Sequence, residues 1–187
     1  DEVLHYWTGL GYYARARNLH KCAQTVVNEF AGEFPKSVEA LEGLSGIGRS
    51  TAGAIASISM GISASILDGN VKRVLSRFHA IEGWPGNKKI ADKMWGIAER
   101  YTPVTRTGDY TQAMMDLGAT LCSRSKPQCQ VCPLMSQCEA YAQDNVKAFP
   151  NSKPKKEKPV KSIRMIMLEH EGEVLLLQQP DSGIWGG

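Results

Sequence analysis

The sequence predicts a mainly α-helical domain, followed by the first β-hairpin of a second domain. Apolar residues recur at helical spacing through most of the first 150 positions, and the period changes after a stretch rich in proline and lysine. The 187 residues are 42% hydrophobic and 22% charged, as in globular chains and unlike disordered or collagen-like ones. No run approaches the roughly 18 apolar residues of a spanning helix, so a membrane protein is excluded.

The first half of the chain is predicted to contain three helices, over residues 15–30, 37–42 and 49–60. Ser37 is a candidate N-cap for the second of these helices, because its hydroxyl can accept a hydrogen bond from a free amide of the first turn. A tight turn over residues 43–48 connects the second helix to the third, which is rich in Ala, Gly and Ser.

The second half continues with three more helices, over residues 69–81, 87–101 and 110–121. Asn87 can cap the second of these helices. The last of them leads into Cys122. Residues 150–162 contain prolines and lysines and are predicted to be a solvated linker. Beyond the linker, residues 163–169 and 173–178 are predicted to form strands joined by a turn at Glu171 and Gly172.

The net charge of +3 gives little support for a nucleic-acid partner. Residues 151–164 alone carry six positive side chains and one negative, so the remainder is close to neutral. A DNA-binding function would therefore need a local site rather than a basic surface as a whole.

Four of the five cysteines lie within one short segment, at Cys122, Cys129, Cys132 and Cys138, whereas Cys22 stands alone. Thiolates suit zinc or iron–sulfur clusters. One Cys-x-x-Cys pair with two unequal arms is unlike a zinc ribbon and can surround a cubane cluster. Zinc and purely structural cysteines remain as alternatives. Arg124 and Lys126 in this loop either contact phosphate or are solvated charges.

The turn formed by Leu44, Ser45, Gly46, Ile47 and Gly48 lies between two helices. Its glycines allow positive φ angles, and its amides can face an anion together with the next helix N-terminus. A dinucleotide fingerprint would need a preceding strand, and a P-loop would need Gly-Lys-Ser/Thr. The remaining interpretations are a phosphate-binding helix–hairpin–helix and an ordinary helix corner.

Asp68 follows the apolar pair Ile66 and Leu67 and opens a predicted helix. Taken alone, it is best interpreted as an N-cap. The functional interpretation is a carboxylate that faces a cleft beside Asn70, and a cap residue can also be an active-site acid.

These features, in this order, resemble the helix–hairpin–helix DNA glycosylase superfamily and its iron–sulfur endonuclease III branch. Within that branch, residues 10–17, 66–74 and 112–118 resemble the adenine DNA glycosylases. The final hairpin is similar to the start of their nudix-like C-terminal domain. The resemblance implies a helical glycosylase core over 1–149. Within it, 1–62 form part of a six-helix barrel that includes hairpin 44–48, and 63–149 form the cluster-bearing half. A linker over 150–162 and the start of the nudix-like domain over 163–187 follow.

The family implies an enzyme of base excision repair that hydrolyses the N-glycosidic bond of a flipped adenine mispaired with 8-oxoguanine or guanine. Asp68 matches the aspartate that stabilises the sugar cation, and Asn70 would position Asp68 or the attacking water. Ser50 stands where bifunctional relatives carry a Schiff-base lysine. Monofunctional base removal is therefore expected.

The resemblance also implies a [4Fe–4S] cluster held by the four clustered cysteines. Tyr12 matches an aromatic wedge that intercalates beside 8-oxoguanine. Arg73 and Arg77 would support the cluster side, although a solvated helix face explains them equally well. The residues assigned to DNA contact are Tyr12, Leu44, Gly46, Ile47, Gly48, Arg49, Lys72, Arg124 and Lys126.

Two departures from the family pattern affect the expectation. Ser45 stands where proline is common, and the family's general acid is a glutamate upstream of Asp1. The sequence is therefore interpreted as a piece of a longer protein, and these 187 residues alone are expected to be inactive in adenine excision.

The alternatives are an endonuclease III-like or mismatched-thymine glycosylase, and a non-catalytic iron–sulfur DNA-binding module. The expected partner is double-stranded DNA with an adenine:8-oxoguanine or adenine:guanine mispair. We expect a monomer in the bacterial cytoplasm, associated with the nucleoid through DNA and not with a membrane. The linker is a candidate contact for repair or replication proteins.

Overall fold

The computed structural model describes residues 2–155, 159–160, 162–164 and 166–177. The chain divides into two compact units, Asp1–Pro154 and Lys155–Gly187. No helix in the described ranges is both long enough and apolar enough to cross a membrane.

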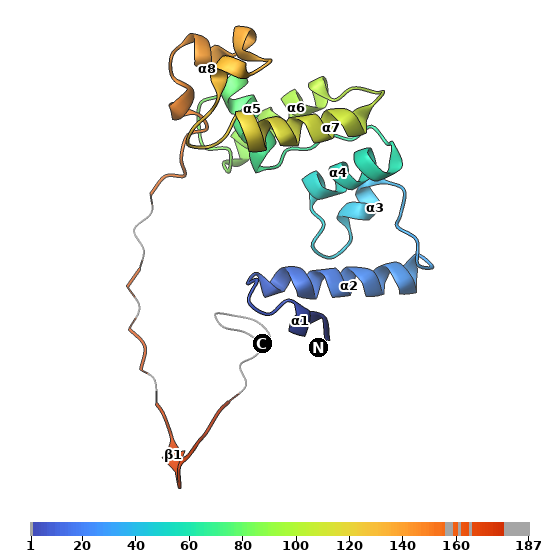
Figure 1. Cartoon of the computed structure of the whole chain (residues 1–187). Helices are drawn as coiled ribbons and strands as arrows, with labels where there is room; N and C mark the ends of the chain where they lie inside the picture. Colours follow the sequence, from blue (N-terminus) through green and yellow to red (C-terminus); the bar gives the residue numbers. More distant parts are fainter. Residues whose placement is uncertain (1, 156–158, 161, 165, 178–187) are drawn as a thin grey trace. The chain divides into compact units, whose positions relative to one another are not determined.

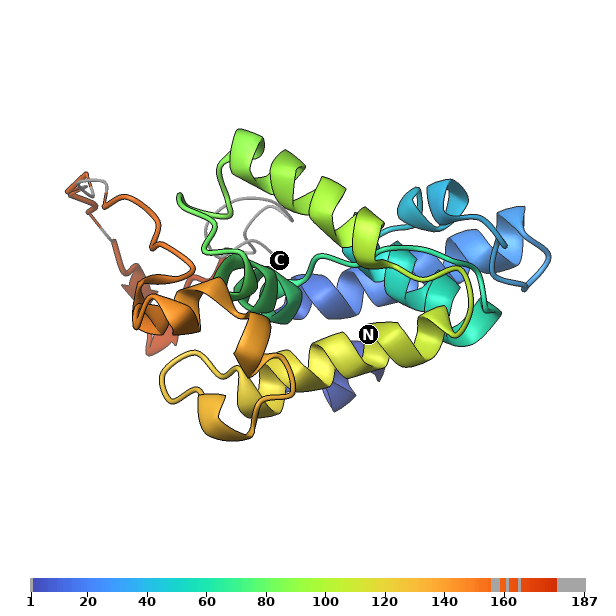
Figure 2. The same cartoon turned by 90° about the horizontal axis from the view of Figure 1, so that it is seen from above.

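The first unit is entirely helical in its regular structure (Figure 1). Its α-helices are α1 (Glu2–Tyr6), α2 (Tyr13–Glu29), α3 (Val38–Glu42), α4 (Arg49–Met60), α5 (Gly69–Phe78), α6 (Lys88–Tyr101), α7 (Thr107–Asp116) and α8 (Glu139–Ala142). Short helices η1 (Leu117–Leu121), η2 (Cys129–Val131), η3 (Met135–Gln137) and η4 (Val146–Ala148) complete it. Helix α4 contacts α3 and α7, and α5 contacts α6, α7, α8 and η1. Figure 2 shows α6 and α7 on either side of α5.

The mainly helical prediction is confirmed, and α4 has the predicted bounds. The predicted caps are also present: the Ser37 hydroxyl accepts a hydrogen bond from the Ala40 amide at 3.2 Å, and the Asn87 side chain accepts one from the Lys89 amide at 3.0 Å. These caps satisfy amides that the first helical turn leaves without partners.

Three helices differ from their predicted bounds. Helix α2 begins at Tyr13 and ends at Glu29, whereas residues 15–30 were predicted. Helix α5 ends at Phe78 instead of residue 81, because Ala80 adopts a positive φ of 44° that a right-handed helix does not allow. The helix expected over 110–121 begins earlier, at Thr107, and its last turn, η1, is a π-helix.

The first unit has two hydrophobic cores. One surrounds α5 and includes Val71, Leu75 and Met94. The other joins α2 to the α3–α4 pair and includes Val26 and Leu41. Between them, α4 and α7 meet through a buried hydrogen bond from the Ser57 hydroxyl to the Thr111 hydroxyl at 3.0 Å.

The second unit contains an antiparallel pair, β1 (Glu169–His170) and β2 (Glu173–Val174), with the turn at the predicted position. The strands are shorter than the predicted 163–169 and 173–178, of which residues 165 and 178 lie outside the described residues. An isolated two-stranded hairpin has marginal stability, and among the described residues of this unit Ile166 and Leu176 are exposed. The nudix-like assignment of 163–187 stays a prediction.

Candidate active site and DNA-binding surface

Asp68 caps helix α5. Its Oδ1 accepts a hydrogen bond from the Val71 amide at 2.8 Å, while its Oδ2 has no hydrogen-bond partner among the described residues. The carboxylate is half-buried and follows the buried residues Ile66 and Leu67. The cap therefore fixes the side chain and leaves one oxygen available to a ligand.

Ser50 holds the segment that precedes Asp68. Its hydroxyl accepts a hydrogen bond from the Leu67 amide at 3.0 Å, which joins the first turn of α4 to the residue next to the carboxylate. Glycine allows this approach, since a Cβ at Gly53 would lie 2.2 Å from the Ser65 carbonyl oxygen. Thus the structure brings together two of the three residues predicted to be catalytic.

Asn70 is held by Arg73, which lies three residues further along α5. The guanidinium donates to Asn70 Oδ1 at 2.9 Å and to the carbonyls of Gly118 and Cys122 at 2.5 and 2.7 Å. A Cβ at Gly118 would lie 2.6 Å from the Asn70 Cβ, so η1 packs directly against the start of α5. Arg73 therefore connects Asn70 to the first cysteine of the loop.

Arg77 is 2% exposed, so the alternative of a solvated arginine face is wrong for this residue. Its guanidinium donates hydrogen bonds to the carbonyls of Cys122, Ser123, Arg124, Val146 and Phe149 and to the Cys122 Sγ, at distances of 2.7–3.4 Å. Multiple carbonyl acceptors compensate for the loss of hydration of this charge. The sequence signal was available in the four-residue spacing from Arg73, but spacing alone could not distinguish burial from solvation.

The four clustered cysteines line a single cavity. Its other lining residues include Arg77, Leu121, Met135 and Tyr141. Among the described residues, no three His, Cys, Asp or Glu side chains have the arrangement of a single-ion site. The candidate centre therefore rests on the shared cavity and on its four soft donors, which suit an iron–sulfur cluster.

The environment of Cys129 and Cys138 disfavours the charged forms of these two thiols. Burial raises the pKa of Cys129, and the neighbouring cysteines raise it further, while Arg77 lowers it. Burial also raises the pKa of Cys138, against hydrogen bonds from backbone amides. A bound cationic centre would displace these protons and compensate for the crowded thiolates.

The glycine turn and Tyr12 line one groove, together with Asn18 and Thr51. Gly46 has a φ of 80°, and a Cβ there would lie 2.8 Å from the Asn18 Cβ. Tyr12 is 86% exposed and precedes α2. Two elements predicted to contact DNA, 34 residues apart in sequence, therefore share a surface.

Other predicted DNA contacts have different surroundings. Leu44 is 3% exposed and belongs to the hydrophobic core that includes Val26 and Leu41, so its side chain does not face a ligand. Arg49 donates to Glu99 at 2.6 Å and stacks on Trp95, with its Cζ 3.8 Å from the ring centroid. Lys72 and Arg124 line a common groove, whereas Lys126 is exposed in the cysteine loop.

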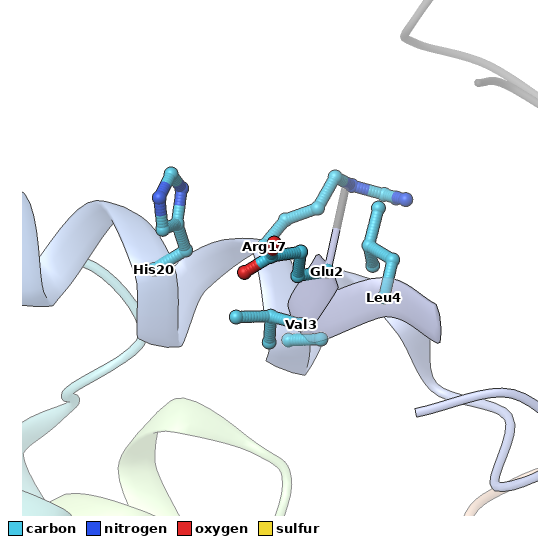
Figure 3. A pocket seen from close by; sticks show the side chains of 6 residues that line it. Glu2, Val3, Leu4, Arg17 and His20 are labelled. Atoms are coloured by element: carbon cyan, nitrogen blue, oxygen red, sulfur yellow. The ribbon is translucent and has the colours of Figure 1, made fainter. Parts of the chain in front are cut away.

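A separate cavity lies between α1 and α2. Figure 3 shows Arg17 and His20 of α2 and Glu2, Val3 and Leu4 of α1 around it. None of the residues assigned to catalysis, DNA or metal lines this cavity. It therefore takes no part in the candidate site.

Comparison with known proteins shows the family to which the sequence is similar. Residues 1–100 match the model of the HhH-GPD superfamily base excision DNA repair proteins. The chain is 43% identical over 185 residues to the adenine DNA glycosylase of Buchnera aphidicola subsp. Acyrthosiphon pisum, covering 99% of this chain and 53% of the relative. It is 45% identical over 141 residues to human adenine DNA glycosylase, covering 75% and 26%. The chain thus spans about half the length of the bacterial relative.

Two solved structures share the fold. A thermostable thymine-DNA glycosylase aligns with a TM-score of 0.67, and a non-covalent complex of endonuclease III with DNA aligns with 0.62. Each is 26% identical, and each alignment covers 76% of this chain and 65% of the other.

Proposed function

The chain belongs to the HhH-GPD superfamily of base excision DNA repair proteins, and we propose that it is the central part of an adenine DNA glycosylase. The proposed reaction is hydrolysis of the N-glycosidic bond of adenine mispaired with 8-oxoguanine or guanine. The observation that carries the proposal is the Oδ2 of Asp68, which has no hydrogen-bond partner in the described part of the chain. The carboxylate lies between the Ser50–Leu67 contact and the Asn70–Arg73 contact.

Asp68 would act on the sugar of a nucleotide that has been flipped out of the duplex. As the bond to adenine breaks, positive charge develops on the sugar, and a fixed carboxylate stabilises it without reorganisation. Asn70, oriented by Arg73, would position the attacking water or Asp68.

Ser50 supports monofunctional chemistry. Its hydroxyl is engaged by the Leu67 amide and cannot form an imine with the opened sugar. The proposed product is therefore an abasic site in an uncleaved strand.

Cys122, Cys129, Cys132 and Cys138 would hold a [4Fe–4S] cluster, in agreement with their shared cavity. Such a cluster supplies a rigid, thiolate-bound centre. Through Arg73 and Arg77, the loop that carries these cysteines braces α5. Measured iron content and a broad visible absorbance would distinguish this centre from zinc.

Double-stranded DNA is the proposed partner. The hairpin amides at 46–48 would contact a phosphate, and Tyr12 would intercalate next to the mispair. Lys72, Arg124 and Lys126 would neutralise backbone charge. We place the protein as a monomer in the bacterial cytoplasm, associated with the nucleoid through this contact.

Mismatched thymine and oxidised pyrimidines form the second candidate substrate class. This class is kept as the alternative because solved structures of a thymine-DNA glycosylase and of endonuclease III have the same fold. Release of thymine but not adenine would replace the proposal with this one.

The test grafts residues 1–187 into the matching position of the Buchnera relative, because the family resemblance assigns base protonation to a glutamate upstream of this segment. We expect the chimera to release adenine from an adenine:8-oxoguanine duplex and Asp68→Asn to lose this release. We expect no release from the 187 residues alone. Unchanged turnover in Asp68→Asn would remove Asp68 from the mechanism.

A further inference from the structure

A basic groove lies next to the start of α5. We call it the Trp84 groove and define it by Lys72, Trp84, Arg124, Lys147, Asn151 and Lys153. Gly69 also lines it, as do Arg73 and Arg77. Among the described residues that form its walls, none carries a carboxylate. The local charge is therefore strongly positive although most of the chain is close to neutral.

The walls of the groove are fixed by specific contacts. A Cβ at Gly86 would lie 2.2 Å from the Trp84 ring, so the indole packs directly on bare backbone. Asn151 Oδ1 accepts a hydrogen bond from the Gly83 amide at 2.5 Å, and its Nδ2 donates to the Ala148 carbonyl at 3.1 Å. These bonds attach the segment after η4 to the turn that carries Trp84.

Two lysines of this segment have no role in the proposed active site. Lys147 and Lys153 are exposed, and the Lys153 Nζ lies 5.2 Å from the centroid of the Trp84 ring. Arg77 holds the same segment through the carbonyls of Val146 and Phe149. The two ammonium groups are thus carried by a stretch of backbone that is held in place before any ligand arrives.

We propose that the Trp84 groove binds the phosphodiester backbone of the DNA strand that leads to Asp68, an inference that rests on the proposed function. Gly69 and Lys72 line the groove and belong to the first turn of α5, so the groove includes the residue directly after Asp68. This adjacency favours a nucleic-acid backbone over an acidic peptide. It adds Lys147 and Lys153 to the residues that neutralise phosphate.

The test measures the binding of the 187-residue chain to an undamaged duplex as a function of salt. Each neutralised phosphate contributes about 0.9 to the slope of log K against log salt. Lys147→Gln/Lys153→Gln should therefore lower the slope by about 2. The matched control is Lys93→Gln/Arg100→Gln, which removes the same charge from exposed positions on α6 that do not line the groove. The control should keep the wild-type slope.

Equal slopes for the groove variant and the control would overturn the proposal. If the groove variant lost binding to poly-glutamate but bound DNA as the wild type does, the proposal would also be overturned, and the groove would be assigned to a protein partner. If the wild-type chain bound no duplex at any salt concentration, the DNA-binding function itself would fail. Circular dichroism of each variant establishes that the fold is retained.

Discussion

The two sides of Asp68 are built by different means. On the side of the glycine turn, one hydroxyl contact from Ser50 and a close backbone approach at Gly53 hold the segment before the carboxylate. On the side of the cysteine loop, Arg73 and Arg77 donate hydrogen bonds to carbonyls of three segments, at Gly118, at 122–124 and at 146–149.

This difference indicates how each side should respond to mutation. The turn side depends on a close backbone approach that leaves no room for a side chain at Gly53, so added side-chain volume should destabilise it most. The cysteine side depends on buried donors, so loss of a donor should damage it most. The predictions below test that distinction.

The largest effect is expected from Arg77→Met. The substitution preserves much of the apolar volume but leaves several buried carbonyls without a donor, which should cost about 3 kcal/mol of unfolding free energy or more. Urea unfolding measures the loss. As a control, Arg100→Met, at an exposed position of α6, should change stability by less than about 0.5 kcal/mol. Similar stability in the two variants would contradict the assignment of Arg77 as the main brace.

Gly53→Ala should destabilise the turn side by about 1–3 kcal/mol, because the new methyl would meet the Ser65 carbonyl oxygen at 2.2 Å. Gly96→Ala is the matched control within a helix, since nothing lies within 4 Å of a Cβ there. That control should gain roughly 0.5–1 kcal/mol from helix propensity. Thermal unfolding measures the change in stability of both variants, and a change of the same sign in the two would refute the role given to Gly53.

Local chemistry explains which parts of this arrangement could be predicted from sequence. Ser37, Asp68 and Asn87 were identified as cap residues because a cap needs only a short polar side chain before a helical pattern. The turn at 43–48 was identified from its glycines. These features depend on neighbours within a few residues.

Features that depend on distant segments were not accessible in the same way. The burial of Arg77 requires carbonyls from residues about 45–70 positions away, and the Trp84 groove requires the segment after η4. No periodicity in the sequence reports either contact. The π-helical turn η1 was likewise predicted as ordinary helix, because its packing against Asn70 is a tertiary contact.

Ser50→Ala is expected to have an intermediate effect on stability, about 1 kcal/mol, because the buried Leu67 amide loses its acceptor. In the chimera, adenine release should fall by roughly fivefold if a similar energy is lost in the transition state. Ser50→Thr retains the hydroxyl and should preserve most of both properties. A Thr variant as impaired as the Ala variant would show that the hydroxyl contact is not what positions Asp68.

The smallest effect concerns Tyr110 in the core around α5. Burial raises the pKa of this phenol above its ordinary value of 10.0, and Tyr101 raises it further. The unfolded chain therefore loses this proton first, so folding stability should fall as the pH rises above about 10. Tyr110→Phe should show a shallower alkaline loss of stability in urea unfolding, whereas Tyr6→Phe, at a position that is 86% exposed, should follow the wild type. Parallel curves for wild type and Tyr110→Phe would mean that this core admits water to the phenol, and that the cysteine side is less tightly packed than its arginine contacts imply.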